Sequence, residues 1–127
     1  MSDRDALLNL SQSLLDSIVE GNWQAYAELC DESLTCFEPE ARGHLVEGLA
    51  FHQFYFDGQP TTKRVNTTMA SPHVRVMGDS AIVCYMRLTQ VIDASNSPVT
   101  KAVEETRIWQ KIDGQWKHVH FHRSLPA

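Results

Sequence analysis

The stretch SAIVCYMRLTQVIDASNSPVTKAVEETRIWQKIDGQWKHVHFHRS, residues 80–124, decides the fold of this chain. It predicts strands over 80–93, 99–112 and 115–123, because β-branched and aromatic runs alternate with turn-forming residues. Asp113-Gly114 is a two-residue hairpin signal, and ASNSP (94–98) links the first two strands. Strands of about 13 residues span roughly 40 Å, which is more than one helix can cover. We therefore expect the sheet to curl around a helix, to present a face to another subunit, or both.

The residues before this stretch predict helices followed by one more strand. Apolar residues recur at helical spacing from Leu7 to Ile18, so a long amphipathic helix should begin after Ser2 and end at Gly21. Further predicted elements are a helix over 22–30, a short strand over 34–39, a helix over 44–56, a loop over DGQPTTK (57–63) and a strand over 64–77 that breaks near Pro72. Helices followed by an antiparallel meander predict an α+β fold, with residues 1–127 forming one domain.

The composition excludes several classes of protein. With 43% hydrophobic residues the chain can form a real core, and its net charge of -5 without a Lys/Arg cluster argues against nucleic acid or an anionic membrane as a partner. No apolar run is long enough for a membrane span, and the N-terminus has no signal-peptide pattern. Three cysteines without CxxC spacing predict free thiols in a reducing compartment, so we expect a cytoplasmic protein.

The turn positions predict a register that gathers polar residues on one face of the sheet. The Asp113-Gly114 turn would pair Arg107 with His120, and the ASNSP loop would place Arg87 opposite Glu105. The other face, with Ile108, Val119, Thr106 and Phe121, would be the more apolar one. A buried guanidinium without a partner is costly, so Glu105 should compensate Arg87. The predicted polar cluster consists of Tyr85, Arg87, Glu105, Arg107, His120 and His122.

Four interpretations of this cluster remain open. Alternate histidines at 118, 120 and 122 could bind a metal, although Arg107 would repel a cation. Histidine, glutamate and tyrosine could transfer protons, but no nucleophile motif accompanies them. The polar groups could simply satisfy one another within the sheet or at a subunit contact. Finally, two arginines that share one acid could bind a small carboxylate or phosphate. We expect neither a bound metal nor catalytic residues, and no cofactor.

Three segments resemble a known family. FEPEARGHLVEGLAFHQFYFD (37–57), YMRLTQ (85–90) and EETRIWQKIDGQWKHVHFHRS (104–124) closely resemble the association (hub) domain of calcium/calmodulin-dependent protein kinase II, which belongs to the NTF2-like, SnoaL-like superfamily. The resemblance implies a curled antiparallel sheet wrapped around a long N-terminal helix. It also implies dimers that assemble into a stacked ring, a dodecamer or tetradecamer.

The resemblance also implies a polar pocket that binds small carboxylates. Hub-domain pocket residues match His52 in FHQFYF, Arg87 in RLTQ and Arg107 in EETR. The expected partners are therefore further copies of the chain, a small carboxylate and other hub-domain chains. Because the chain begins at Met1 and the resemblance fills it, we expect no kinase activity. The alternative is a small NTF2-like isomerase, dehydratase or cyclase, with Glu105 and His120 as the groups that transfer protons.

Overall fold

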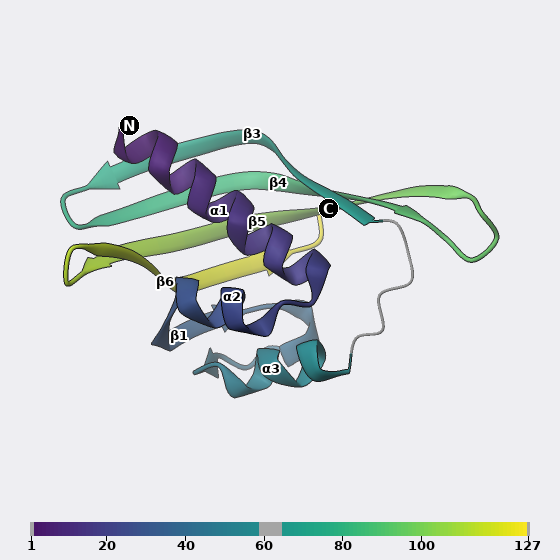
Figure 1. The fold of residues 1–127 in the computed structure, drawn as a ribbon, viewed down its shortest axis with the longest axis horizontal. Coiled ribbons are helices and arrows are strands. Elements are labelled where there is room, and N and C mark those ends of the chain that lie inside the picture. Colours follow the sequence, from purple (N-terminus) through teal and green to yellow (C-terminus); the bar gives the residue numbers. More distant parts are fainter. Residues whose placement is uncertain (1, 59–64, 127) are drawn as a thin grey trace.

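The computed structural model describes residues 2–58 and 65–126, and it has the helix-then-sheet order of an α+β fold (Figure 1). A six-stranded sheet has the order β2-β1-β6-β5-β4-β3; β1 and β6 are parallel, and the other neighbours are antiparallel. The elements are α1 (Asp3–Glu20), α2 (Trp23–Leu29), β1 (Cys30–Phe37), the 3-10 turn η1 (Pro39–Ala41), β2 (Val46–Glu47), α3 (Ala50–Asp57), β3 (Val65–Met77), β4 (Ser80–Ile92), β5 (Pro98–Ile112) and β6 (Gln115–Ser124).

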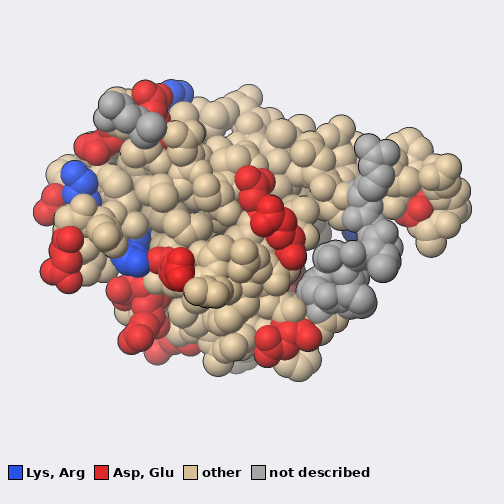
Figure 2. All heavy atoms as spheres, viewed as in Figure 1, with Lys and Arg blue, Asp and Glu red and all other residues tan. Residues whose placement is uncertain are grey.

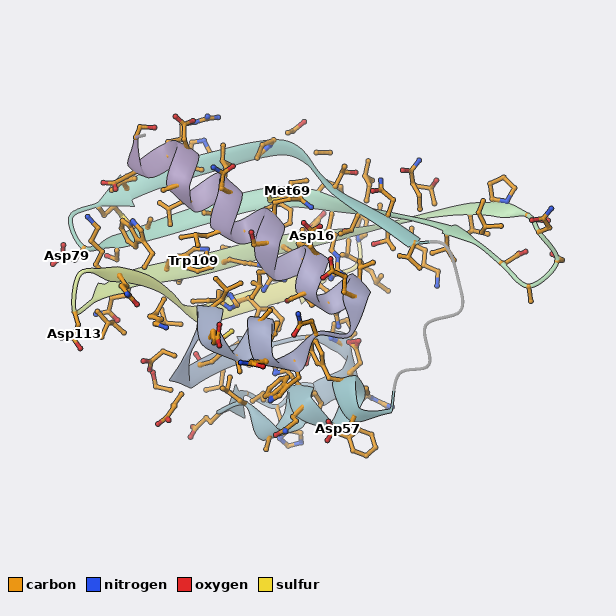
Figure 3. The ribbon with its side chains drawn as sticks, viewed as in Figure 1. Asp16, Asp57, Met69, Asp79, Trp109 and Asp113 are labelled. Atoms are coloured by element: carbon orange, nitrogen blue, oxygen red, sulfur yellow. The ribbon has the colours of Figure 1, made fainter. Side chains whose placement is uncertain are left out.

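The long N-terminal helix is confirmed, with both predicted end signals. The Ser2 hydroxyl accepts a hydrogen bond from the backbone N–H of Asp5, and Gly21 ends the helix in the left-handed conformation at φ 67°. Leu7 and Leu14 are fully buried in one core with Trp109 of β5. Figure 3 shows Trp109 on the side of the sheet that α1 crosses. The apolar stripe of α1 thus covers the middle of one sheet face.

Two predicted boundaries need correction, and one predicted loop lies outside the described residues. The strand predicted over 34–39 begins earlier, at Cys30, and ends at Phe37. The helix predicted over 44–56 begins only at Ala50, because Val46 and Glu47 pair with β1 as the edge strand β2. Most of the predicted loop DGQPTTK (57–63) belongs to residues that the structure does not describe.

The hairpins confirm the predicted turns. Asp113 and Gly114 both have positive φ, 54° and 79°, and Ile112 pairs with Gln115 across them. The labelled Asp79 and Asp113 lie in turns at the same end of the sheet (Figure 3). The predicted break near Pro72 is a register shift between Ala70 and His73 within one continuous strand.

Strand length exceeds helix length, as the sequence predicted. The 15 residues of β5 span roughly 50 Å, whereas the 18 residues of α1 span about 27 Å. The β4–β5 hairpin therefore projects beyond α1 (Figure 1). Acidic side chains outnumber basic ones on the α1-covered side of the molecule (Figure 2), in line with the net charge of -5. No helix among the described residues is both long and apolar enough to cross a membrane.

The predicted register is wrong at two places, with different consequences. Across β4 and β5, Arg87 pairs with Val103 and Tyr85 with Glu105, a shift of two residues that leaves every side chain on its predicted face. Across β5 and β6, a bulge between Ile108 and Trp109 makes Val119 the extra residue. Beyond it the pairing is one residue off the prediction, and a one-residue shift exchanges the two faces of β6.

The bulge changes which residues of β6 lie on the buried face of the sheet. Arg107 pairs with Phe121 rather than His120, so Phe121 joins the polar cluster and His120 points to the other face. The face that carries Glu105, Arg107 and Trp109 is the buried one, not the more apolar-looking face with Ile108. The polar cluster is therefore part of the interior of the protein.

Candidate functional site

The site is centred on Glu105, a buried carboxylate that two arginines share. Arg87 Nη1 donates to Glu105 Oε2 at 3.3 Å, and Arg107 Nη2 donates to Glu105 Oε1 at 3.1 Å. The Tyr85 hydroxyl donates to Glu105 Oε1 at 2.7 Å and accepts from Arg107 Nε at 2.7 Å. All four residues are at most 8% exposed. The four predicted strand residues of the cluster therefore form one hydrogen-bonded group.

The buried arginines and Glu105 keep one another in their charged forms. Burial alone would raise the pKa of Glu105, but Arg107 and Arg87 bring it below its ordinary value. Burial would lower the pKa of Arg107, but Glu105 raises it. Burial raises the pKa of Tyr85 well above its ordinary value, so the phenol stays protonated and donates to Glu105. Glu105 is thus a charged acceptor with both oxygens in use.

The three histidines of β6 do not act as one ladder. His118 is fully buried, with Nε2 3.3 Å from Arg107 Nη1 and Nδ1 3.5 Å from Cys30 Sγ. Burial and the charge of Arg107 lower the pKa of His118, so its neutral ring accepts from Arg107. His120 bonds to Thr35 on the opposite face, at 2.7 Å from Nδ1 to Oγ1. Neither His120 nor His122 reaches the Glu105 cluster, because the bulge at Val119 turns them away.

A second polar group comes from the end of β1, the start of η1 and α3. His52 Nε2 lies 2.8 Å from Glu38 Oε1 and 3.6 Å from Cys36 Sγ. Glu38 Oε2 accepts from Arg123 Nη2 at 3.0 Å, and Arg123 also contacts the half-exposed Glu40. Arg123 pairs with Glu105 across β5 and β6, which brings this group beside the first one.

A cavity of about 220 Å³ joins the two groups. Its polar walls come from Glu38, His52, Arg87, Glu105, Arg107 and Arg123, and its apolar walls include Tyr26, Phe56 and Phe121. The cavity lies where the apolar core under α1 gives way to the charged part of the same sheet face. Its volume suits a molecule of a few carbon atoms.

The structure brings together most of the residues predicted for the site. His52, Arg87, Glu105 and Arg107 line the cavity; Tyr85 does not, but it hydrogen-bonds to Glu105 and Arg107. His120 and His122 do not line it. Sequence reasoning missed Arg123, which the one-residue register shift places on the cavity side. It also missed that Cys36 lies beside His52. All three cysteines are free thiols, as predicted.

Comparisons with known proteins agree with this architecture. Residues 3–127 match the family model of the calcium/calmodulin dependent protein kinase II association domain. The delta subunit of calcium/calmodulin-dependent protein kinase type II from Oryctolagus cuniculus is 44% identical over 124 residues, 95% of this chain. The chain spans only 23% of the length of that relative.

Solved structures show the same fold. The kinase II hub homology domain of Chlamydomonas reinhardtii is 53% identical with a TM-score of 0.92, covering 99% of this chain and 100% of that one. An NTF2-like protein from Cytophaga hutchinsonii is 17% identical with a TM-score of 0.82, covering 99% of this chain and 100% of that one. The predicted NTF2-like fold is thereby confirmed.

We predict that Glu105→Gln destabilises the chain by about 3–5 kcal/mol, because it removes the carboxylate charge that compensates two buried guanidinium groups. Urea unfolding at fixed protein concentration measures this loss. Glu104→Gln is the matched control, since Glu104 is exposed on the other face of the same strand and should change the free energy of unfolding by less than about 0.5 kcal/mol. Equal effects of the two substitutions would contradict the central role of Glu105.

The pH dependence of the same difference is a separate prediction. The folded-state pKa of Glu105 is below its ordinary value of 4.5, so its contribution is fully present above pH 4.5 and is lost as the pH falls through the folded-state pKa. The stability gap between the wild type and Glu105→Gln should therefore narrow on acidification below pH 4.5. A gap that stays constant down to pH 2 would mean that the carboxylate charge is not what stabilises the fold.

Proposed function

The chain belongs to the calcium/calmodulin dependent protein kinase II association domain family, and we propose that it is a single hub domain that self-assembles and binds a small carboxylate. The observation that carries the ligand proposal is the pair of buried arginines on the wall of the cavity. The proposed assembly is a stacked ring built from dimers, with twelve or fourteen subunits, as the family resemblance implies.

Self-assembly is supported by apolar surface on the sheet and on α3. Ile82 and Met86 of β4 are only half-buried, on the face opposite the one that α1 covers. Val99 in the projecting hairpin is 39% exposed, and Phe54 of α3 is 74% exposed. Apolar surface of this kind is favoured at subunit contacts, because association removes it from water.

Carboxylate binding is supported by the donors that the cavity offers. Arg87 uses Nε toward Thr67 and Nη1 toward Glu105, and within the described residues its Nη2 group makes no hydrogen bond. A guanidinium donates two parallel hydrogen bonds to a carboxylate, which suits a planar acid. Arg123 is a second donor. Its partner Glu40 is half-exposed, so the carboxylate of a ligand can take the place of the Glu40 carboxylate.

The enzymatic alternative is less well supported. Glu105 and His120 were its proton-transfer candidates, yet Glu105 has both oxygens engaged and a lowered pKa, and His120 points away from the cavity. Relatives below 25% identity share only the fold with this chain, so an activity named for any of them does not carry over. A binding cavity fits the arrangement better than an acid/base centre.

We expect the native mass, measured by light scattering behind a sizing column, to be twelve or fourteen times 14.4 kDa. The half-buried apolar face of β4 and the exposed residues of α3 are then covered by neighbouring subunits. A mass of one or two chains at micromolar concentration would overturn the ring proposal, while leaving the fold and the cavity as described.

We expect butyrate to bind the cavity and Arg87→Ala to weaken that binding at least tenfold. Isothermal titration calorimetry measures the affinity, and butyramide, which has the same shape without the charge, should not bind. Arg75→Ala is the matched control, because Arg75 is exposed on β3 and should leave the affinity unchanged. Equal affinities of the wild type and Arg87→Ala would exclude the proposed carboxylate site.

A further inference from the structure

The group formed by Cys36, Glu38 and His52 brings three kinds of metal ligand together beside the cavity. Cys36 and Glu38 are two residues apart on an extended segment, so both point inward, while Phe37 between them is 40% exposed. α3 places His52 against the same side of this segment. The three residues are at most 8% exposed. One sulfur, one nitrogen and one oxygen therefore meet inside the protein, all within 4.8 Å of one another.

We propose that these three side chains form a binding site for a tetrahedral divalent transition metal, with zinc as the best match. Thiolate, imidazole and carboxylate are the three ligand types that zinc takes in proteins. Glu38 and His52 both line the cavity wall, so the proposed ion has the cavity beside it for a fourth ligand. This is the arrangement of three protein ligands and one open position, rather than a closed structural site.

Two of the three ligand-to-ligand distances are close to those of a tetrahedral ion, and all three ligand atoms lie within 4.8 Å of one another. Ordinary zinc bond lengths put a sulfur and a nitrogen ligand roughly 3.5 Å apart, and a nitrogen and an oxygen ligand roughly 3.3 Å apart. The distance from Cys36 Sγ to His52 Nε2 is 3.6 Å and already matches. The distance from His52 Nε2 to Glu38 Oε1 is 2.8 Å, a hydrogen bond that must open by about half an ångström.

The surrounding contacts orient the ligand atoms. Arg123 Nη2 holds Glu38 Oε2 at 3.0 Å, which leaves Oε1 facing His52 and Cys36; ligating carboxylates commonly have such a partner. Of the two ring nitrogens of His52, Nε2 faces Cys36 and Glu38, whereas Nδ1 is buried and makes no hydrogen bond with the described residues. A deprotonated Cys36 and a charged Glu38 neutralise a divalent ion in full. Burial makes the Cys36 thiol a weak acid, so metal binding must release its proton to solvent.

The same strand contains a natural comparison. Cys30 and His118 form a second buried pair, with Sγ and Nδ1 3.5 Å apart. His118 Nε2 is occupied by Arg107, and in the described part of the chain no carboxylate completes a third ligand around this pair. Metal should therefore bind at Cys36 and not at Cys30.

The test uses cobalt as a spectroscopic substitute for zinc. The purified full chain, freed of metal and kept reduced with a phosphine, is titrated with cobalt chloride. The expected result is one cobalt per chain, a near-ultraviolet thiolate-to-cobalt absorption band, intense visible bands typical of tetrahedral cobalt, and loss of all of them when zinc is added. Absence of the thiolate band at one equivalent of cobalt would overturn the proposal.

Variants assign the site. Cys36→Ser retains the size of the side chain and should lose the thiolate band, whereas Cys30→Ala should keep the band with unchanged intensity. Glu38→Gln should weaken cobalt binding at least tenfold while circular dichroism and native mass stay as in the wild type. A band that survives in Cys36→Ser, or that disappears in Cys30→Ala, would place the metal elsewhere and refute the assignment. Full cobalt affinity in Glu38→Gln would also refute it.

Discussion

The carboxylate of Glu105, held between two arginines inside the sheet, is the constraint on which the arrangement of the site depends. A guanidinium in the interior is tolerated only when a charge and hydrogen bonds compensate it. Glu105 does this for Arg87 and Arg107 together, and the Tyr85 hydroxyl closes the group by donating to Glu105 and accepting from Arg107. The same sheet face is apolar under α1, with Ala81, Val83 and Trp109, and charged beyond it. The cavity lies at that boundary, with apolar walls on one side and charged walls on the other.

Alternation along a strand made the strand residues of this group predictable. A register error of two residues between β4 and β5 left Tyr85, Arg87, Glu105 and Arg107 on one face, because side chains repeat with a period of two. The bulge at Val119 was not predictable, since nothing in KHVHFHR marks the extra residue. It exchanged His120 and His122 for Phe121 and Arg123. The one extra residue of the bulge thus decides which of these side chains face the cavity. Local secondary-structure propensity contains no information about such a bulge.

The convergence of Cys36, Glu38 and His52 was unpredictable for a different reason. The local structure of each residue could be predicted separately. Cys36 and Glu38 are alternate residues of an extended segment before Pro39, and His52 belongs to a helix rich in aromatic residues. Their meeting depends on β2 pairing with β1, which fixes where α3 begins, and on Glu38 continuing the extended chain before η1. The helix predicted over 44–56 wrongly included Val46 and Glu47, so the pairing of β2 with β1 was not predicted. Long-range placement of a short helix, rather than any residue pattern, assembles this part of the cavity.

The balance of charge around the cavity determines how it can select a ligand. Three arginines, Arg87, Arg107 and Arg123, face three carboxylates, Glu38, Glu40 and Glu105, so the walls carry little net charge, and the chain as a whole is acidic. Selection must therefore come from the direction of individual donors and acceptors rather than from a long-range field. Arg87 offers N–H groups that no described residue accepts from on one side, and Glu38 and His52 offer acceptor atoms on the other. Arg123 connects the two sides, because it donates to Glu38 and lies beside Glu105 in the sheet. A ligand that draws the Arg123 guanidinium away from Glu38 therefore also changes the acceptor side of the cavity.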